Sequence, residues 1–210
     1  LADTDIVLTT RELARMIKAC GIDFLALDGD TKVDSMLGEY SGAGTIFGVT
    51  GGVMEAALRT AVATLLDKDL EKLEFMETRG MEGVKEASLD VGGTEVRIAV
   101  AHGMVNIETV LNKIRAAKEA GEETPYHFVE VMACRGGCIG GGGQPHGATD
   151  EVRAKRTAGI YSDDEKSVVR SSHKNPEIIK CYDEFLGQPN SHKAHELLHR
   201  TYITRPVYNK

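Results

Sequence analysis

The chain has 210 residues and a formal net charge of −7, and this length is enough for one large domain or two small ones. The negative charge argues against a nucleic-acid partner and against an anionic membrane surface, because both of these bind basic faces. No apolar run approaches the roughly 20 residues that cross a bilayer. The first residues do not resemble a signal peptide, and the chain begins at Leu1 rather than Met, which suggests a processed product, an excised fragment or a truncated record.

The cysteine content points to a reducing compartment. The four cysteines are Cys20, Cys134, Cys138 and Cys181, which are too few and too scattered for a disulfide scaffold. We therefore expect a cytoplasmic protein. The closely spaced pair, Cys134 and Cys138, is the one that carries chemical information.

The sequence pattern in the first third of the chain predicts two helices separated by a glycine-rich segment. Thr9 or Thr10 can cap a helix that ends near Gly21. Residues 22–27 then predict a short buried strand or extended segment. Glycines crowd residues 38–52, which indicates backbone that approaches something closely or adopts positive φ. Apolar residues at helical spacing predict a second helix over residues 53–66.

The rest of the chain predicts a hairpin, another strand and further helices. Residues 83–101 alternate as two strands about a Gly-Gly turn, and residues 126–132 predict a buried strand. Helices are expected over 106–120, 151–158, 176–186 and 191–199. This pattern predicts an α/β fold with a short, mostly parallel sheet flanked by helices and including a β-hairpin. We expect a single domain over 1–210, with terminal helices at about 151–200.

Cys134 and Cys138 lie in a loop whose composition suits an iron–sulfur cluster. Thiolates hold the iron, whereas the inorganic sulfurs need space and backbone N–H donors. Glycines can supply both, and they stand at Gly136, Gly137 and 140–143, before Gln144 and Pro145 close the loop. Three other interpretations stay open, namely a glycine-rich turn with incidental thiols, a zinc site completed by His127 or His146, and a phosphate loop.

The segment Glu130–Pro145 resembles the last of the three signature motifs of iron-only ([FeFe]) hydrogenases, Glu-x-Met-Ala-Cys-x-Gly-Gly-Cys followed by Gly-Gly-Gly-Gln-Pro. The similarity extends to residues 41–59, to residues 100–103 and to the ending at residues 191–199. The ending most resembles the NAD(P)-linked, multi-subunit branch of the family. Essentially the whole chain is covered, so the resemblance implies one lobe of a hydrogenase catalytic domain.

This resemblance implies a cofactor, a reaction and partners. Cys134 and Cys138 would ligate the [4Fe–4S] part of the H-cluster, and Cys138 would bridge it to a two-iron subcluster carrying CO, cyanide and a bridging dithiolate. Met132 and Phe47 would line the apolar wall of the two-iron unit. The reaction would be reversible H2 formation from protons and electrons. The partners would be an N-terminal lobe and redox subunits or ferredoxin-type domains.

The chain also departs from the family pattern. The two other signature motifs, which carry the remaining cluster cysteines, the proton-relay cysteine and a cyanide-contacting lysine, are absent from it. We interpret Cys20 and Cys181 as packing residues, and Arg135 stands where the family often has proline. The isolated chain is therefore expected to be inactive and to bind a cluster weakly. A non-catalytic iron–sulfur scaffold or assembly-type protein is the alternative function.

Three histidines and two glutamates outside the cysteine pair are also candidates for a role. His195, Glu196 and His199 match the H-E-x-x-H helix of zinc hydrolases, but a catalytic zinc needs a third protein ligand and no His, Asp, Glu or Cys follows His199. A polar surface helix is the simpler interpretation. His102 is expected to have a hydrogen-bonded structural role. Glu130 is expected to accept hydrogen bonds from loop amides.

Overall fold

A computed structural model describes residues 5–29, 31, 38–199 and 201 of the chain. The helices are α1 (Thr10–Ala19), α2 (Gly42–Thr45), α3 (Gly52–Leu66), α4 (Met104–Ala120), α5 (Asp150–Lys166), α6 (Pro176–Cys181) and α7 (His192–Leu198), and the strands are β1 (Val84–Val91), β2 (Thr94–His102) and β3 (Phe128–Met132). Residues 28–37 have a polar, turn-rich sequence, and most of them lie outside the described residues. In the described part, no helix is long and apolar enough to cross a membrane.

The sheet contains three strands in the order β1-β2-β3. The hairpin β1–β2 is antiparallel and turns at Gly92 and Gly93, whose φ angles of 61° and 87° suit the tight turn predicted there. Strand β3 pairs with β2 in parallel, and this register places Met132 opposite His102. The α/β fold is confirmed, with a sheet that is mixed because one pairing is parallel and the other antiparallel.

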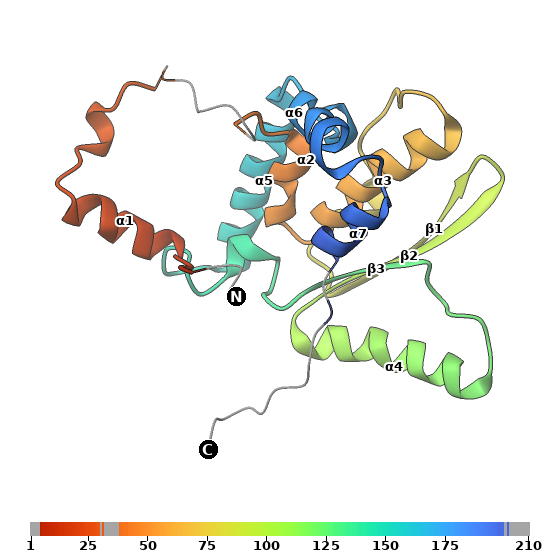
Figure 1. Cartoon of the computed structure of the whole chain (residues 1–210). Coiled ribbons are helices and arrows are strands. Elements are labelled where there is room, and N and C mark those ends of the chain that lie inside the picture. Colours follow the sequence, from red (N-terminus) through yellow and green to blue (C-terminus); the bar gives the residue numbers. More distant parts are fainter. Residues whose placement is uncertain (1–4, 30, 32–37, 200, 202–210) are drawn as a thin grey trace.

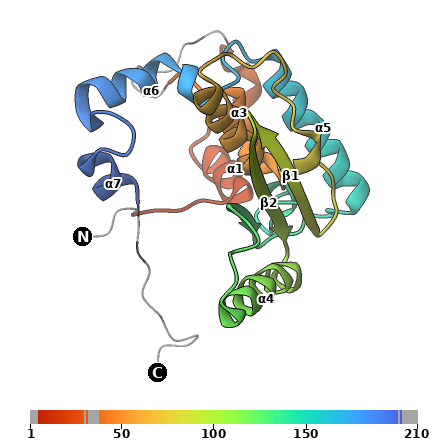
Figure 2. The ribbon, with the colours of Figure 1, turned by 90° about the vertical axis from the view of Figure 1, so that its right-hand side faces the viewer.

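Helices cover both faces of the sheet, because the side chains of β2 alternate between them. On one face, Met54 and Leu58 of α3 pack against Ile98 and Val100. On the other face, Ile107 and Val110 of α4 pack against Ala99 and Ala101 of the same strand. Figure 1 shows α4 on one side of the sheet and α3 with α5 on the other, and Figure 2 shows the same arrangement from the side.

A third buried cluster connects the glycine-rich segment to the cysteine loop. It contains Ala43, Ile46, Val49, Ala56, Ile139 and Tyr161. These residues come from α2, the 3-10 turn Ile46–Gly48 and the residue after it, α3, the turn Cys138–Gly140 and α5. Gly52 allows the close approach, since a Cβ atom there would lie 1.6 Å from the carbonyl oxygen of Ile46. The glycines of residues 38–52 therefore serve tight packing beside the loop, as the sequence predicted.

A buried network of charged side chains links α3 to α5. Arg59 is fully buried and donates to both carboxylate oxygens of Asp164, at 2.7 and 2.8 Å, and to Glu55 at 2.8 Å. Arg79 also binds Glu55, and Arg170 also binds Asp164. Each buried charge thus has an opposite charge within hydrogen-bonding distance, which is what burial of ionised groups requires.

Helix α1 forms as predicted but packs on little of the core. Thr9 and Glu12 make a complete capping box, and Gly21, at φ 69°, follows its end. None of the helix residues is buried. The strand predicted at residues 22–27 is wrong: Phe24–Ala26 form a 3-10 turn, and Leu25 is 94% exposed. Its apolar residues have no facing layer among the described residues, so no strand forms.

The remaining helices follow the predictions with changes at their ends. Helix α4 begins at Met104, and α5 continues to Lys166, eight residues beyond the expected 158. The predicted helix 176–186 divides into α6 and a π-helical turn over Tyr182–Leu186. Cys20, expected to pack, is instead exposed at the end of α1, whereas Cys181 is half-buried.

Candidate functional site

The cysteine loop leaves the sheet directly from β3. Cys134 follows that strand, and Cys138 begins the short turn Cys138–Gly140. Both thiols are free and exposed. Between them, Gly136 and Gly137 are buried and have φ angles of 78° and 94°, a region that favours glycine. The loop therefore turns its backbone inward and presents its two cysteines outward.

The loop glycines provide space, but their amides are used by the protein. The N–H groups of Gly137, Gly140 and Gly141 donate to the carbonyls of Cys134, Gly137 and Cys138, respectively. The role predicted for these amides, as donors to inorganic sulfur, is therefore taken by contacts within the loop. The prediction of space holds at Gly141, where a Cβ atom would lie 3.6 Å from the Cys134 sulfur.

Two residues from other elements hold Gly136 in place. Its N–H donates to Nδ1 of His102 over 3.1 Å, and its carbonyl accepts from the N–H of Thr50 over 3.0 Å. The other imidazole nitrogen of His102 faces the Met81 carbonyl at 3.3 Å. Burial lowers the pKa of His102, which favours the neutral ring that can accept from Gly136. The structural role predicted for His102 is confirmed, and it serves the loop itself.

Glu130 stabilises the beginning of α3. Its carboxylate accepts from the N–H of Gly51 at 2.6 Å and from that of Met54 at 2.8 Å. Burial raises the pKa of Glu130, while these two hydrogen bonds oppose that rise. A negative charge at a helix N-terminus also interacts favourably with the helix dipole. Glu130 thus accepts hydrogen bonds from backbone amides, as expected of it, but these amides belong to Gly51 and to the first turn of α3 and not to the cysteine loop.

Lys85, on β1, lies close enough to Glu130, on β3, to interact with its charge. Its ammonium donates to the carbonyl of Gly80 at 2.9 Å and reaches that of Thr50 at 3.5 Å. Burial lowers the pKa of Lys85 to about 8, against the attraction of Glu130 and Glu82. No sequence pattern singled out this lysine, because a Lys in a strand is ordinarily a solvated residue.

The shifted pKa of Lys85 predicts a measurable pH dependence. Between pH 8 and the ordinary pKa of 10.5, the unfolded chain holds a proton that the folded chain has released. The free energy of unfolding should therefore rise with pH there, by on the order of 2 kcal/mol or less after allowance for partial exposure. Urea unfolding from pH 7 to 10 should show this rise in the native chain and a smaller one in Lys85→Met. Equal slopes in both proteins would contradict the prediction.

The predicted apolar residues lie on either side of the loop. Met132 is half-buried at the end of β3, and its sulfur would lie 3.0 Å from a Cβ atom at Gly137. Phe47 belongs to the turn Ile46–Gly48, which contacts the turn beginning at Cys138, and its side chain is 48% exposed. The structure thus brings both residues to the loop, and a role for them toward a cofactor stays a prediction.

Arginines of α5 and of the loop itself fasten the cysteine loop to that helix. Arg135 makes a two-bond ion pair with Asp150, at 2.9 and 2.7 Å. Arg156 donates to the carbonyls of Ile139 and Pro145. Arg153 packs beneath the loop, where its Nε would lie 2.8 Å from a Cβ atom at Gly140. The charge that Arg135 adds is therefore compensated by Asp150.

The zinc alternatives gain no support from the described residues. His127 accepts from the N–H of Arg97 on β2, and His146 contacts the guanidinium of Arg11. Helix α7 ends at Leu198, so His199 lies beyond it, with its ring stacked on that of His195. Within the described ranges, no group of three His, Cys, Asp or Glu side chains is placed to hold a metal ion.

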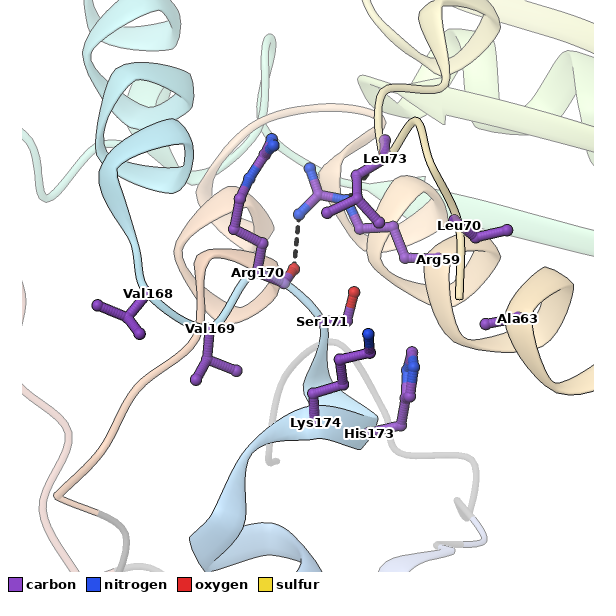
Figure 3. A pocket seen from close by; sticks show the side chains of 10 residues that line it. All are labelled: Arg59, Ala63, Leu70, Leu73, Val168, Val169, Arg170, Ser171, His173 and Lys174. Carbon is purple, nitrogen blue, oxygen red and sulfur yellow. Dashed lines mark hydrogen bonds between the residues drawn. The ribbon is translucent and has the colours of Figure 1, made fainter. Parts of the chain in front are cut away.

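A separate cavity of about 370 Å³ lies away from the predicted site residues. Figure 3 shows its lining, with the Arg59 guanidinium donating to the carbonyl of Arg170 over 2.8 Å. Its basic side chains already have partners, since Arg59 and Arg170 bind Asp164 and Lys174 binds Asp69. The cavity thus has a mixed polar and apolar lining, and its Arg and Lys side chains are all paired with carboxylates. It does not compete with the cysteine loop as a site.

The chain is most strongly similar to iron-only hydrogenases. Residues 2–142 match the family described as "Iron only hydrogenase large subunit, C-terminal domain", and residues 150–205 match "Iron hydrogenase small subunit". The chain is 49% identical to the NADP-reducing hydrogenase subunit HndD of Solidesulfovibrio fructosivorans, covering 97% of this chain and 34% of that protein. It is 42% identical to iron hydrogenase 1 of Clostridium pasteurianum, and the match covers 96% of this chain and 35% of that protein.

Solved structures agree with this similarity. A structure described as showing stepwise [FeFe]-hydrogenase H-cluster assembly matches with a TM-score of 0.69 and 39% identity, covering 94% of this chain and 55% of that one. A weaker similarity, 30% identity, covers 96% of this chain and 43% of protein NAR1 of Arabidopsis thaliana. The chain spans about a third of the length of the curated hydrogenases it matches and about half of the solved hydrogenase chain. It belongs to the family of iron-only hydrogenase large subunits, as part of their C-terminal domain.

Proposed function

We propose that this chain is one lobe of a hydrogenase catalytic domain that forms and consumes H2, with Cys134 and Cys138 as iron ligands. The observation that carries the proposal is the pair of exposed thiols on a buried glycine turn, at the positions of the family motif. Family membership and the name of the 49% identical relative, an NADP-reducing hydrogenase subunit, support the reaction.

The residues present fit an iron–sulfur group. Thiolates are its usual ligands, and the absence of a side chain at Gly141 leaves room beside the Cys134 sulfur. The buried hydroxyl of Thr50, next to Gly136, has no hydrogen-bond partner among the described residues, so it is available as a donor. An H-cluster bound here would supply the redox chemistry that joins protons and electrons to H2.

The chain's own residues would hold and shield this group. Cys134 and Cys138 would bind the iron, and Cys138 would also bridge to the two-iron unit. Met132 and Phe47 would exclude water from the apolar side of the site. Gly136, Gly137, Gly140, Gly141 and Gln144 would shape the loop around the cluster. His102 fixes the loop backbone from within the sheet.

The missing ligands imply a partner lobe, which we propose docks on the N-terminal arm of this chain, residues 6–27. Large apolar side chains are exposed along the arm, including Met16, Phe24 and Leu25. The arm is tied to the cysteine loop, because the N–H of Arg11 donates to the carbonyl of Gly143. The matched hydrogenase structure has nearly as much chain again, which supports such a lobe. Redox subunits and a cytoplasmic location belong to the same proposal.

Reconstitution tests the function. The chain should be combined anaerobically with a polypeptide that carries the other two signature motifs, and loaded with the H-cluster. H2 evolution is expected, and it should fall by at least about a hundredfold in Cys138→Ala, because the bridging ligand is lost. Cys20→Ala, which removes an exposed thiol at the end of α1, is the matched control and should retain activity. Full activity in Cys138→Ala would contradict the assignment.

A second candidate is a non-catalytic iron–sulfur scaffold or assembly-type protein. The observation that favours it is the similarity, at 30% identity over 210 residues, to a protein of Dictyostelium discoideum that is named a probable cytosolic Fe-S cluster assembly factor. Element analysis of the purified protein separates the candidates. Iron with sulfide and H2 activity supports the hydrogenase, the same metal content without H2 activity in the completed protein supports the scaffold, and zinc supports neither.

A further inference from the structure

The peptide group between Thr50 and Gly51 is held at both its N–H and its carbonyl, next to the cysteine loop. Thr50 donates its N–H to the carbonyl of Gly136 in the cysteine loop, over 3.0 Å. The N–H of Gly51 donates to Glu130 over 2.6 Å, and the Thr50 carbonyl faces the Lys85 ammonium at 3.5 Å. A buried carboxylate thus binds the N–H end of one peptide group, and a half-buried ammonium faces its carbonyl end. The first residue of this peptide group, Thr50, also binds the cysteine loop.

The geometry around Gly51 leaves this peptide little freedom. Gly51 has a φ of 89°, and a Cβ atom there would lie 1.8 Å from the carbonyl oxygen of Thr78 and 3.3 Å from the Lys85 nitrogen. Glu130 is 4% exposed and is also fixed by the N–H of Met54. The Lys85 ammonium is fixed by the carbonyl of Gly80. Movement of either charged group would therefore move the peptide and the loop contact that it carries.

We infer that Lys85 and Glu130 are positioning residues for the cysteine loop, acting through the Thr50–Gly51 peptide on Gly136 and so on the placement of Cys134 and Cys138. As a role in cofactor binding, this inference rests on the proposed function. The two residues lie on β1 and β3, the outer strands of the sheet, so they tie the loop to both edges. Both side chains act on the loop through hydrogen bonds to backbone atoms.

The test compares Lys85→Met and Glu130→Gln with matched surface variants. Lys85→Met keeps the aliphatic stem and removes the ammonium, and Glu130→Gln keeps the shape and replaces an acceptor oxygen by a donor. Lys113→Met and Glu86→Gln are the controls, because these residues form an ion pair that is partly exposed, at 2.8 Å. All variants are made in the full chain, without metal for the first measurement.

The first measurement is amide hydrogen exchange at Gly136 and Gly137, with cysteine alkylation by iodoacetamide alongside. Loss of one buried hydrogen bond should speed exchange at both glycines by roughly fivefold in each test variant. The alkylation rates of Cys134 and Cys138 should change relative to Cys20, which is an internal reference. Exchange of the core amide of Val110 should match the native chain, which separates a local change from global unfolding. The controls should change none of these rates.

Unchanged exchange at Gly136 and Gly137 in both folded variants would overturn the inference. If Lys85→Met does not fold, Glu130→Gln tests the same peptide from its other side. A second measurement follows reconstitution with ferrous iron and sulfide, where the variants should show altered electron paramagnetic resonance spectra. If the native chain, completed with the polypeptide that carries the other two signature motifs, retains no iron, the proposed function fails, whereas the exchange experiment still decides whether Lys85 and Glu130 position the loop.

Discussion

Replacing Arg59 by Met lowers the free energy of unfolding by about 3–5 kcal/mol, as expected when one member of a buried ion pair is removed. The Arg59 side chain is fully buried and binds Asp164, Glu55 and the carbonyls of Leu73 and Arg170. Methionine fills much of the volume but satisfies none of these groups. The remaining carboxylates then keep only their second partners, Arg170 for Asp164 and Arg79 for Glu55.

Urea unfolding followed by circular dichroism measures this effect. The matched control is Lys155→Met, because Lys155 and Glu151 form an exposed i,i+4 ion pair at 2.7 Å. That pair should contribute no more than about 0.5 kcal/mol. If Arg59→Met lowered the free energy of unfolding by less than about 1 kcal/mol, the proposed contribution of the network to stability would be contradicted.

The same network predicts acid sensitivity. Burial alone would raise the pKa of Asp164, but its hydrogen bonds to Arg59 and Arg170 outweigh burial and hold the pKa below its ordinary value. The stability from this shift is present above the pKa of the unfolded chain and is lost as pH falls through the folded pKa. Arg59→Met should therefore flatten the decline in stability below about pH 4.

The network also tests whether the chain is one domain. Arg59 lies in the region that matches the large-subunit family, and Asp164 lies in the region that matches the small-subunit family. Because the ion pair connects the two regions inside the core, we expect a single cooperative unfolding transition. Two separate transitions would contradict the single domain predicted from the sequence.

Gly137→Ala is the second substitution with a large expected effect, and it acts on the cysteine loop. Gly137 has a φ of 94° and a ψ of −164°, a conformation that other residues adopt at a cost of roughly 1–3 kcal/mol. A Cβ atom would lie 2.9 Å from both the Gly48 carbonyl oxygen and the Thr50 nitrogen, which are backbone atoms that cannot turn aside. The loop must shift outward, and we expect loss of most of the iron retained after anaerobic reconstitution.

Gly142→Ala is the control within the same loop. Gly142 has an ordinary φ, and a Cβ atom there would meet nothing within 4 Å. Its effect on stability should stay within about 0.5 kcal/mol, and iron retention should match that of the native chain. For both variants, thermal unfolding measures the stability and iron content per chain measures the iron retention. Equal iron retention in Gly137→Ala and Gly142→Ala would show that the loop tolerates displacement.

Local sequence signals predicted the secondary structure well where the signal is itself local. The capping box of Thr9 and Glu12 and the turn at Gly92 and Gly93 depend on neighbouring residues only, and both form. The prediction for residues 22–27 failed because an apolar run becomes a strand only when another strand or layer pairs with it. At the site, the sequence predicted the cysteine loop, but it gave no sign of Lys85 beside it.

By itself, the sequence determined which residues can hold a metal and where the chain turns, because thiol chemistry and glycine backbone freedom are properties of the residues. Only the tertiary structure decided what surrounds Cys134 and Cys138. The contacts of Gly136 with His102, and of Gly51 with Glu130, join residues 34 and 79 positions apart. Such pairs form when the sheet and α3 pack together, since no local pattern records which distant partner a buried polar group will meet.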